Sequence, residues 1–253
     1  MLTVQRWEEI VRILERDGSI DVNTLSDQFG VTAKTIRQDL AELEAKGLLE
    51  RVHGGAVFRS KGSGVFPILE RKQHNLEEKE RIATAALKYI IDDDTIILDG
   101  GSTTLQLAKK LPEQRLIVIT NDLIVAGELL PREPVTLYLT GGKLRREGVY
   151  TLLGREAERI INSYNVNKLF LATSALDFEQ GLTVLSEEEA EIKKAMLNAA
   201  KEVICLADFS KFHKVALVSF APLKKIDRLI TDDRIPQTDL KRLAALGIKV
   251  DVV

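Results

Sequence analysis

The chain has 253 residues and a mass of 28.2 kDa, enough for one large domain or for a small domain followed by a medium one. Hydrophobic residues make up 45% and charged residues 29%, a balance that supports a folded core and excludes a disordered or collagen-like chain. No apolar run approaches the roughly 18 residues of a membrane span. The first residues form an amphipathic repeat with acids rather than the apolar stretch of a signal peptide. We therefore expect a cytoplasmic protein without a membrane partner.

The cysteine content and the charge distribution narrow the function classes further. A single cysteine, Cys205, excludes an internal disulfide and a cysteine-based zinc site, and its apolar neighbours favour a buried thiol. We expect no metal and no cofactor. The net charge of −2 gives no overall attraction for nucleic acid. However, residues 31–62 hold six basic and four acidic residues, whereas residues 1–30 hold three basic and six acidic ones. Any positive field is therefore local.

The amino-terminal residues predict two short helices. Apolar residues between residues 5 and 16 recur on one face of a helix, which Asp17 and Gly18 end. A second helix fits residues 23–29, with Asn23 as its N-cap and Gly30 in the left-handed turn that follows. Only a tight turn separates it from the next helical pattern.

The third predicted helix begins after Thr32, which can cap it, and Gly47 closes it. Its inward face consists of Ile36, Leu40 and Leu43. Two short apolar stretches around His53 then predict a β-hairpin with glycine in its turn. Three helices and a hairpin in this order are typical of a winged helix-turn-helix.

The outward residues of the third helix are of the types that read DNA. In a helix-turn-helix the second helix of the motif enters the major groove, and residues near its amino end reach bases and phosphates. The alternative is an ordinary polar face on a three-helix domain, but the tight turn and the hairpin favour DNA binding. The hairpin residues could contact the backbone as a wing, although a turn histidine often has no such role. The candidate DNA-binding residues are Thr32, Ala33, Lys34, Thr35, Arg37, Gln38, Arg51 and His53.

The rest of the chain predicts a second domain. We expect a helix-turn-helix unit at 1–58, a Gly, Ser and Pro-containing linker at 59–74, and a larger domain at 75–253. After residue 75 the pattern alternates between helices and apolar strands, which indicates a mostly parallel sheet covered by helices. The predicted strands are TIILD, LIVIT, TLYLT, LFLAT, VICLAD and RLITD.

The amino-terminal run GSIDVNTLSDQFGVTAKTIRQDLAELEAKGLLERVHGGAV resembles the winged helix-turn-helix of the DeoR family of bacterial sugar-metabolism repressors. That family's signature includes V-S-x-x-T-I-R-R-D-L and a following R-x-H-G-G-A. Thr32 stands where the family usually has serine, which caps equally well, and Gln38 stands where a second arginine is common. The resemblance covers about 50 contiguous residues, with turn, helix and hairpin in order. It implies an operator-binding protein.

Small polar or charged residues follow several of the predicted strands. They occur in the runs DGGSTT, TN, TGG, TS and DFSK. Because the carboxyl ends of parallel strands share one edge, where ligands bind in such sheets, we expect these runs to converge. A glycine turn before a helix amino terminus suits a phosphate, and Lys211 adds a positive charge. Each run alone could also be a capped turn or a surface ion pair.

The same runs resemble the sugar-phosphate sensor domain of the DeoR family. That domain is similar in fold to ribose-5-phosphate isomerase, so the resemblance implies a Rossmann-like α/β fold. The resemblance also touches Glu189 and Lys193 or Lys194, but charges at that spacing on a helix more often form a solvated face. The candidate effector-binding residues that it implies are Asp99, Gly101, Ser102, Thr103, Thr104, Asn121, Gly142 and Lys211.

The leading hypothesis is a repressor of a sugar-catabolism operon whose operator affinity depends on a phosphorylated sugar or polyol. The first alternative is an isomerase-like enzyme, since carboxylates beside a cation suit enediol chemistry, but an isomerase needs no DNA-reading domain. The second is a DNA-binding protein whose sheet domain only assembles subunits. Two-fold operators and one recognition helix per chain predict a homodimer or homotetramer.

Overall fold

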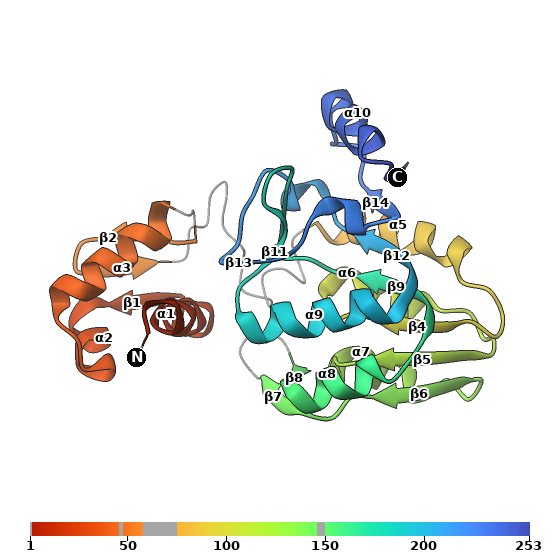
Figure 1. The fold of residues 1–253 in the computed structure, drawn as a ribbon, viewed down its shortest axis with the longest axis horizontal. Coiled ribbons are helices and arrows are strands. Elements are labelled where there is room, and N and C mark those ends of the chain that lie inside the picture. Colours follow the sequence, from red (N-terminus) through yellow and green to blue (C-terminus); the bar gives the residue numbers. More distant parts are fainter. Residues whose placement is uncertain (1, 46–47, 58–74, 146–149) are drawn as a thin grey trace.

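The computed structural model describes residues 2–45, 48–57, 75–145 and 150–253 (Figure 1). The expected linker at 59–74 and the helix end expected at Gly47 lie outside these ranges. The described residues form a small amino-terminal winged-helix unit and a larger unit built around a parallel sheet. Among them, no helix combines the length and the apolar character needed to cross a membrane.

The winged-helix unit contains the three helices and the hairpin that the sequence predicts. It also contains a short strand, β1, that the sequence did not reveal, and β1 pairs antiparallel with β3 to give a sheet of order β1-β3-β2. The elements are α1 (Thr3–Asp17), β1 (Ser19–Asp21), α2 (Val22–Phe29), α3 (Ala33–Ala45), β2 (Glu50–Val52) and β3 (Gly55–Val57).

The start of α2 differs from the expectation. The N-cap is Asp21, not Asn23: the Asp21 carboxylate accepts hydrogen bonds from the backbone N–H groups of Asn23 and Thr24 at 2.9 and 3.0 Å. Asp21 is the last residue of β1 and keeps the extended conformation that an N-cap needs, so α2 begins one residue earlier than predicted. Gly18 and Gly30 end α1 and α2, as expected, and both adopt the left-handed conformation that the sequence predicted for Gly30.

The core of the winged-helix unit is the one that the helical periodicity predicts. Ile36, Leu40 and Leu43 of α3 are buried against Ile10 and Leu14 of α1. Thr32 precedes α3, and its hydroxyl accepts a hydrogen bond from the backbone N–H of Thr35 at 3.2 Å, as a cap does. These contacts fix which face of α3 points outward.

The larger unit is an α/β domain around a seven-stranded sheet of order β15-β14-β12-β9-β4-β5-β6. Every neighbouring pair in this sheet is parallel, which confirms the predicted fold class. All six predicted strands are present, and β15 is an additional strand at one edge. The strands are β4 (Thr95–Leu98), β5 (Leu116–Thr120), β6 (Val135–Leu139), β9 (Val166–Leu171), β12 (Ala200–Leu206), β14 (Arg228–Thr231) and β15 (Lys249–Val252).

Helices cover both faces of the sheet (Figure 1). Alternate residues of β4 divide between the two layers, since Ile96 and Leu98 pack in one buried cluster and Ile97 packs in the other. The first layer contains α5 (Leu76–Ala86), α6 (Ser102–Lys110) and α7 (Leu123–Leu129). The second layer contains α8 (Arg155–Asn162), α9 (Glu187–Ala199) and α10 (Gln237–Ala245).

Two small antiparallel sheets and three 3-10 turns complete the described part of the larger unit. One sheet has the order β10-β11-β13. Residues in and beside this sheet belong to two buried clusters, that of the winged-helix unit and that of the layer with α8, α9 and α10. The strands of this sheet are β10 (Ala175–Asp177), β11 (Gly181–Val184) and β13 (Val218–Ala221). The other sheet is a pair of antiparallel strands, β7 (Lys143–Arg145) and β8 (Thr151–Leu153). The 3-10 turns are Leu87–Tyr89, Phe209–Lys211 and Leu223–Lys225.

The strand order creates a switch point between β4 and β9. From β4 the chain proceeds outward through β5 and β6, and from β9 it proceeds in the opposite direction through β12, β14 and β15. Connections on opposite sides of such a point leave a crevice at the carboxyl ends of the two central strands. Ligand binding is therefore expected beyond the ends of β4 and β9.

Candidate functional site

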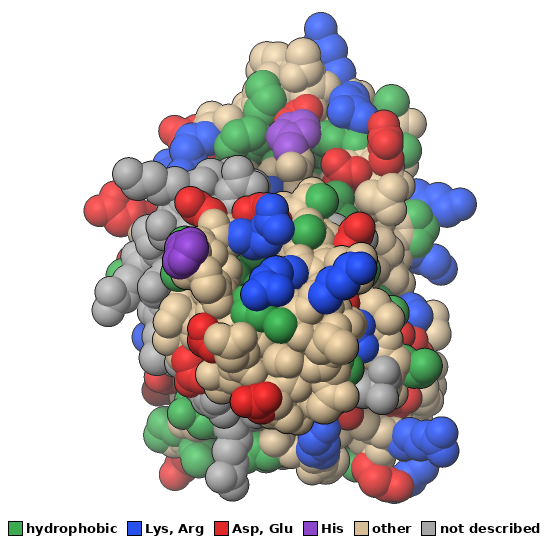
Figure 2. Space-filling model, turned by 90° about the vertical axis from the view of Figure 1, so that its left-hand side faces the viewer, with side chains coloured by type: hydrophobic (Ala, Val, Ile, Leu, Met, Phe, Trp, Pro, Cys, Tyr) green, Lys and Arg blue, Asp and Glu red, His purple; other side chains and the backbone are tan. Residues whose placement is uncertain are grey.

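The outward face of α3 presents polar side chains to solvent. Lys34, Arg37 and Gln38 are exposed, whereas Ala33 and Thr35 are half-buried. The side chains most available to DNA are therefore two cations and an amide near the amino end of the helix, where they can reach base edges and phosphates. Viewed toward the winged-helix end of the molecule, Figure 2 shows Lys and Arg side chains gathered near the centre of this face.

The hairpin lies beside the carboxyl end of α3. Arg51 in β2 contacts Glu44 of α3 twice, with its guanidinium 2.8 Å and its backbone nitrogen 2.9 Å from the carboxylate. Both side chains are substantially exposed, so this pair is of small energetic value, about 0–1 kcal/mol. His53 is exposed in the turn between β2 and β3. Both hairpin residues can therefore face a DNA backbone.

A buried ion pair fixes α3 to α1. The Arg6 guanidinium donates to Asp39 of α3 at 2.5 and 3.0 Å, and the Trp7 indole N–H donates to the same carboxylate at 2.8 Å. Asp39 and Arg6 are almost completely buried, and the Asp39 carboxylate raises the pKa of Arg6. Because breaking a buried charged pair is costly, these contacts hold α1 and α3 together.

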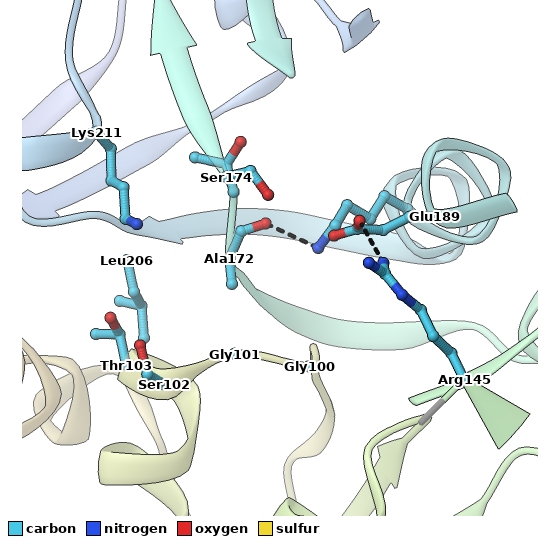
Figure 3. Close-up of a pocket in the computed structure, with 12 residues that line it drawn as sticks. Gly100, Gly101, Ser102, Thr103, Arg145, Ala172, Ser174, Glu189, Leu206 and Lys211 are labelled. Carbon is cyan, nitrogen blue, oxygen red and sulfur yellow. Dashed lines mark hydrogen bonds and ion pairs between the residues drawn. The ribbon is translucent and has the colours of Figure 1, made fainter. Parts of the chain in front are cut away.

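A polar cavity lies at the switch point of the parallel sheet (Figure 3). Its wall comes from the loop after β4, the segment after β9, the end of β12, the 3-10 turn that follows it, α9 and the β7 strand. The residues that line it are Gly100, Gly101, Ser102, Thr103, Arg145, Ala172, Thr173, Ser174, Glu189, Lys193, Leu206 and Lys211.

One end of the cavity has the groups that an anion requires. Ser102 and Thr103 begin α6, whose first backbone N–H groups have no partner within the helix. Lys211 lies across from them (Figure 3). Gly101 allows the loop to approach β9 closely, because a Cβ atom there would lie 2.7 Å from the Cβ of Ala172. This end suits a phosphate group.

The opposite wall consists of paired charges. Arg145 of β7 donates to the Glu189 carboxylate of α9 at 3.2 Å (Figure 3). One turn further along α9, the Lys193 ammonium lies 2.5 Å from Asp99 and donates to the carbonyl of Ala172 at 3.0 Å. Burial raises the pKa of the Asp99 carboxyl, while Lys193 opposes that rise. Such donors and acceptors suit the hydroxyl groups of a sugar or polyol.

The cavity contains four of the eight effector-binding candidates, Gly101, Ser102, Thr103 and Lys211. Asp99 and Thr104 lie directly behind its wall: Asp99 accepts a hydrogen bond from the N–H of Ala172, and the Thr104 hydroxyl donates to the carbonyl of Gly101. Both side chains are buried and position the wall rather than line it.

The structure does not bring Asn121 and Gly142 to the cavity wall. They follow β5 and β6, which continue the sheet away from the switch point. The Asn121 amide donates to the carbonyl of Leu152 in β8 at 3.2 Å. Gly142 adopts φ +119°, and a Cβ atom there would lie 2.5 Å from the carbonyl oxygen of Leu153, so the glycine serves the packing of the hairpin.

Two charges of α9, Glu189 and Lys193, do not lie on the solvated face that their spacing favours. Lys193 is buried and Glu189 faces the cavity, whereas Lys194 is exposed and pairs with Glu191 on the same helix. Arg145 was absent from the candidates, because the β7–β8 hairpin reaches the cavity only through the tertiary fold. The best available signal for Glu189 and Lys193 was the family resemblance.

Comparison with known proteins connects this geometry to a family. Residues 6–61 match the family described as "DeoR-like helix-turn-helix domain", and residues 74–233 match "DeoR C terminal sensor domain". The chain belongs to the DeoR family. It is therefore a DNA-binding transcriptional regulator with a sensor domain, and the isomerase alternative is not supported.

Curated relatives of this DeoR-family chain match over nearly its whole length. It is 37% identical to the HTH-type transcriptional regulator GlpR of Haloferax volcanii, covering 99% of this chain and 98% of the relative. It is 38% identical to the uncharacterized HTH-type transcriptional regulator YulB of Bacillus subtilis, covering 100% and 98%. It is 33% identical to the HTH-type transcriptional repressor GlcR of Bacillus subtilis, covering 93% and 90%.

Solved structures that are similar to this DeoR-family chain include an isomerase and a regulator. Ribose 5-phosphate isomerase A from Methanocaldococcus jannaschii is 19% identical over 55% of this chain and 56% of that chain, with a TM-score of 0.39. The sorbitol operon regulator SorC from Klebsiella pneumoniae is 12% identical over 96% of this chain and 99% of that chain, with a TM-score of 0.42.

Proposed function

We propose that this DeoR-family chain represses a sugar-catabolism operon and that a phosphorylated sugar or polyol, bound in the cavity at the switch point, modulates its affinity for the operator. The observation that carries the proposal is the arrangement of the cavity. The α6 amino terminus and Lys211 meet at one end, and two ion pairs, Arg145–Glu189 and Lys193–Asp99, lie at the other. A ligand with a phosphate at one end and hydroxyl groups along its length matches both ends.

The operator contact is assigned to α3 and the hairpin. Lys34, Arg37 and Gln38 are placed to read base edges or phosphates, and Thr32, Ala33 and Thr35 place the amino end of the helix near the backbone. Arg51 and His53 are assigned to the flanking phosphates. The family match and the exposed face of α3 support this assignment.

The proposal includes the expected domains, 1–58 and 75–253 joined by 59–74, a cytoplasmic location and assembly as a homodimer or homotetramer. Two chains that hold two reading helices on adjacent half-sites bind an operator more tightly than one, because the second contact becomes intramolecular. The names of relatives support the regulatory role, and that of GlcR includes the word repressor.

The ligand is tested by calorimetry with glycerol 3-phosphate, ribose 5-phosphate, fructose 6-phosphate and inorganic phosphate, on the wild type and on Lys211→Ala. A lost charged hydrogen bond is worth about 1.5 to 3 kcal/mol, so the affinity of the best ligand should fall roughly 10- to 100-fold in the variant. Lys225→Ala removes the same charge from an exposed position outside the cavity and should bind normally.

The alternatives give different results in the same experiment. Binding of no sugar phosphate would support a sheet domain that only assembles subunits, and conversion of a bound sugar phosphate into its isomer would support an enzyme. Repression is tested separately by deleting the gene. Transcripts next to the chain's binding sites should rise, and a fall would indicate an activator.

A further inference from the structure

The two units of the protein contact each other through a hydrogen bond between α1 and α9. The Glu8 carboxylate accepts from the backbone N–H of Glu187 at 2.8 Å. Glu187 is the first residue of α9, so its N–H is one of those that the helix itself cannot satisfy. Ser186, the N-cap, satisfies another N–H of the same first turn by accepting from Glu189. A residue of the DNA-reading unit therefore completes the capping of a sensor helix.

An apolar contact accompanies this hydrogen bond. Ala175, Leu185 and Ala216 of the larger unit are buried in the same cluster as the core of the winged-helix unit, with exposed fractions of 0%, 3% and 4%. Leu217 packs against the cluster as well. The winged-helix unit therefore rests on the small β10-β11-β13 sheet and on the start of α9.

The same helix forms part of the cavity wall. Glu189 and Lys193 line the cavity, and Glu187 lies on the same rigid helix, about 9 Å from Lys193 along the axis at 1.5 Å per residue. Figure 1 shows the amino end of α9 directed toward the winged-helix unit. A ligand that pulls on Glu189 or Lys193 must therefore shift the group to which Glu8 is bonded.

A second connection runs through backbone carbonyls. The hydroxyl of Thr173, which lines the cavity, donates to the carbonyls of Ala175 and Thr183 at 2.9 and 3.1 Å. The Thr183 hydroxyl accepts from the N–H of Ala216 at 2.7 Å. Ala175 and Ala216 are two of the residues that contact the winged-helix core. The cavity wall and the contact surface are thus parts of one hydrogen-bonded structure.

On the DNA side, the path from Glu8 to the reading helix is short. Arg6 and Trp7 are neighbours of Glu8 on α1, and both bond to the buried carboxylate of Asp39 on α3. Asp39 directly follows Gln38, one of the exposed residues of the reading face. A displacement of α1 at Glu8 is therefore transmitted to α3 without a flexible segment between them.

We propose that Glu8 is a positioning residue that couples the occupancy of the sensor cavity to the orientation of the reading helix, through its hydrogen bond to the amino end of α9. This inference rests on the proposed function, because it requires a ligand in the cavity. Ligand binding moves α9 relative to the sheet, changes the Glu8 contact and so changes the fraction of chains whose reading helices fit an operator. Such coupling requires a contact with two states, whose equilibrium is shifted both by a ligand in the cavity and by DNA at the reading helix.

Two acidic side chains, Glu187 and Glu188, act on the Glu8 carboxylate. Burial raises the pKa of the Glu8 carboxyl, and the charges of Glu187 and Glu188 raise it further. The hydrogen bond from the Glu187 N–H and the charge of Arg12 oppose this rise. The hydrogen bond and the apolar contact therefore act against local repulsion.

The test measures operator affinity with and without a saturating concentration of the sugar phosphate that binds the wild type most tightly in the calorimetric panel. The operator is the sequence that the wild type protects in a footprint of its own promoter region. Glu8→Ala removes the acceptor, and Glu8→Gln keeps an oxygen that can accept from Glu187. Glu9→Ala is the matched control, since Glu9 pairs with Arg12 within α1.

In the wild type the ligand should change operator affinity by about 5- to 150-fold, the usual range for coupled sites. In Glu8→Ala this factor should fall to within about twofold of unity, while calorimetry should still detect ligand binding. Glu8→Gln and Glu9→Ala should retain most of the wild-type factor. The fluorescence of Trp7, which is the single tryptophan of the chain, should respond to ligand in the wild type but not in Glu8→Ala.

An unchanged coupling factor in Glu8→Ala, with a wild-type Trp7 response, would overturn the inference and leave the proposed function intact. A ligand that binds the wild type without changing its operator affinity would instead overturn the proposed function, and the inference with it.

Discussion

Lys193 and Asp99 form a salt bridge of 2.5 Å in which the two side chains are only 3% and 2% exposed. The pair connects α9 to the end of β4 at the wall of the cavity, and the Asp99 carboxylate also accepts from the N–H of Ala172 beyond β9. The cavity wall is therefore held by charges that water does not reach. A ligand therefore meets ordered side chains, and a force on Lys193 acts on α9 as a whole.

We predict that Asp99→Asn destabilises the protein strongly, because it leaves the Lys193 ammonium buried without its counter-charge. Removing one partner of a buried pair costs about 3–5 kcal/mol of unfolding free energy. Urea denaturation of the variant and the wild type measures this loss. Glu191→Gln disrupts the exposed pair of Glu191 and Lys194 on the same helix and should cost less than about 1 kcal/mol. Equal stability of Asp99→Asn and wild type would show that the pair contributes nothing.

A second prediction concerns the reading helix. Arg37→Ala should lower operator affinity by about 1 to 3 kcal/mol, the value of one good base or phosphate contact, without lowering the melting temperature. Arg37 is exposed on α3 and outside the winged-helix core. Gel-shift titrations at one fixed salt concentration measure the effect. Arg115→Ala is the matched control, because Arg115 is exposed in the larger unit and pairs with Asp92 and Asp93; it should bind the operator normally. Unchanged operator affinity in Arg37→Ala would remove Arg37 from the interface.

The parts of the fold that depend on local patterns could be predicted from the sequence. The spacing of Ile36, Leu40 and Leu43 identified the buried face of α3, and the six apolar runs identified six of the seven strands of the main sheet. The strand β1 has only three residues, of which one is buried, so it carried no periodic signal. Its absence from the prediction also explains the wrong cap, since Asp21 ends that strand.

The candidate site could be predicted only where it follows the strand ends of the switch point. Ser102, Thr103 and Lys211 come directly after β4 and β12, so the parallel topology alone places them together. Helical spacing could not show that Lys193 lines the cavity, because a buried lysine and a solvated lysine can occur at the same spacing along a helix. Lys193 is buried because the fold places Asp99 beside it. Arg145 depends on how a hairpin folds over the sheet, which no local pattern encodes.

A third prediction concerns Cys205, which is fully buried in β12. Burial raises the pKa of its thiol to about 12, so the thiol stays protonated and unreactive at about pH 8, where an ordinary cysteine forms a useful fraction of thiolate. A disulfide reagent should therefore fail to label the native protein at that pH and should label the denatured protein fully. Rapid labelling of the native protein would show that β12 opens.

A fourth prediction uses the close approach at Gly101. Gly101→Ala places a methyl group 2.7 Å from the Cβ of Ala172 and 3.2 Å from the Thr104 hydroxyl, so the loop must shift, and the amino end of α6 with it. Stability should fall by about 1–3 kcal/mol, as for other overpacked sites, and sugar-phosphate affinity should fall too. Gly127→Ala in α7 meets no atom within 4 Å and should be neutral or stabilising by up to about 1 kcal/mol. Normal ligand affinity in Gly101→Ala would separate this loop from the binding site.

The most direct measurement is the affinity of the wild type and of Lys211→Ala for the best sugar phosphate, by calorimetry, with and without saturating operator. If the sugar phosphate controls DNA binding from the cavity, the operator must change wild-type ligand affinity by the same factor by which the ligand changes operator affinity. Lys211→Ala should bind the operator normally and the ligand roughly 10- to 100-fold more weakly. Ligand affinity that is unaffected by the operator in the wild type, or unaffected by the loss of Lys211, would contradict the assignment of this cavity as the sensor of a DNA-binding regulator.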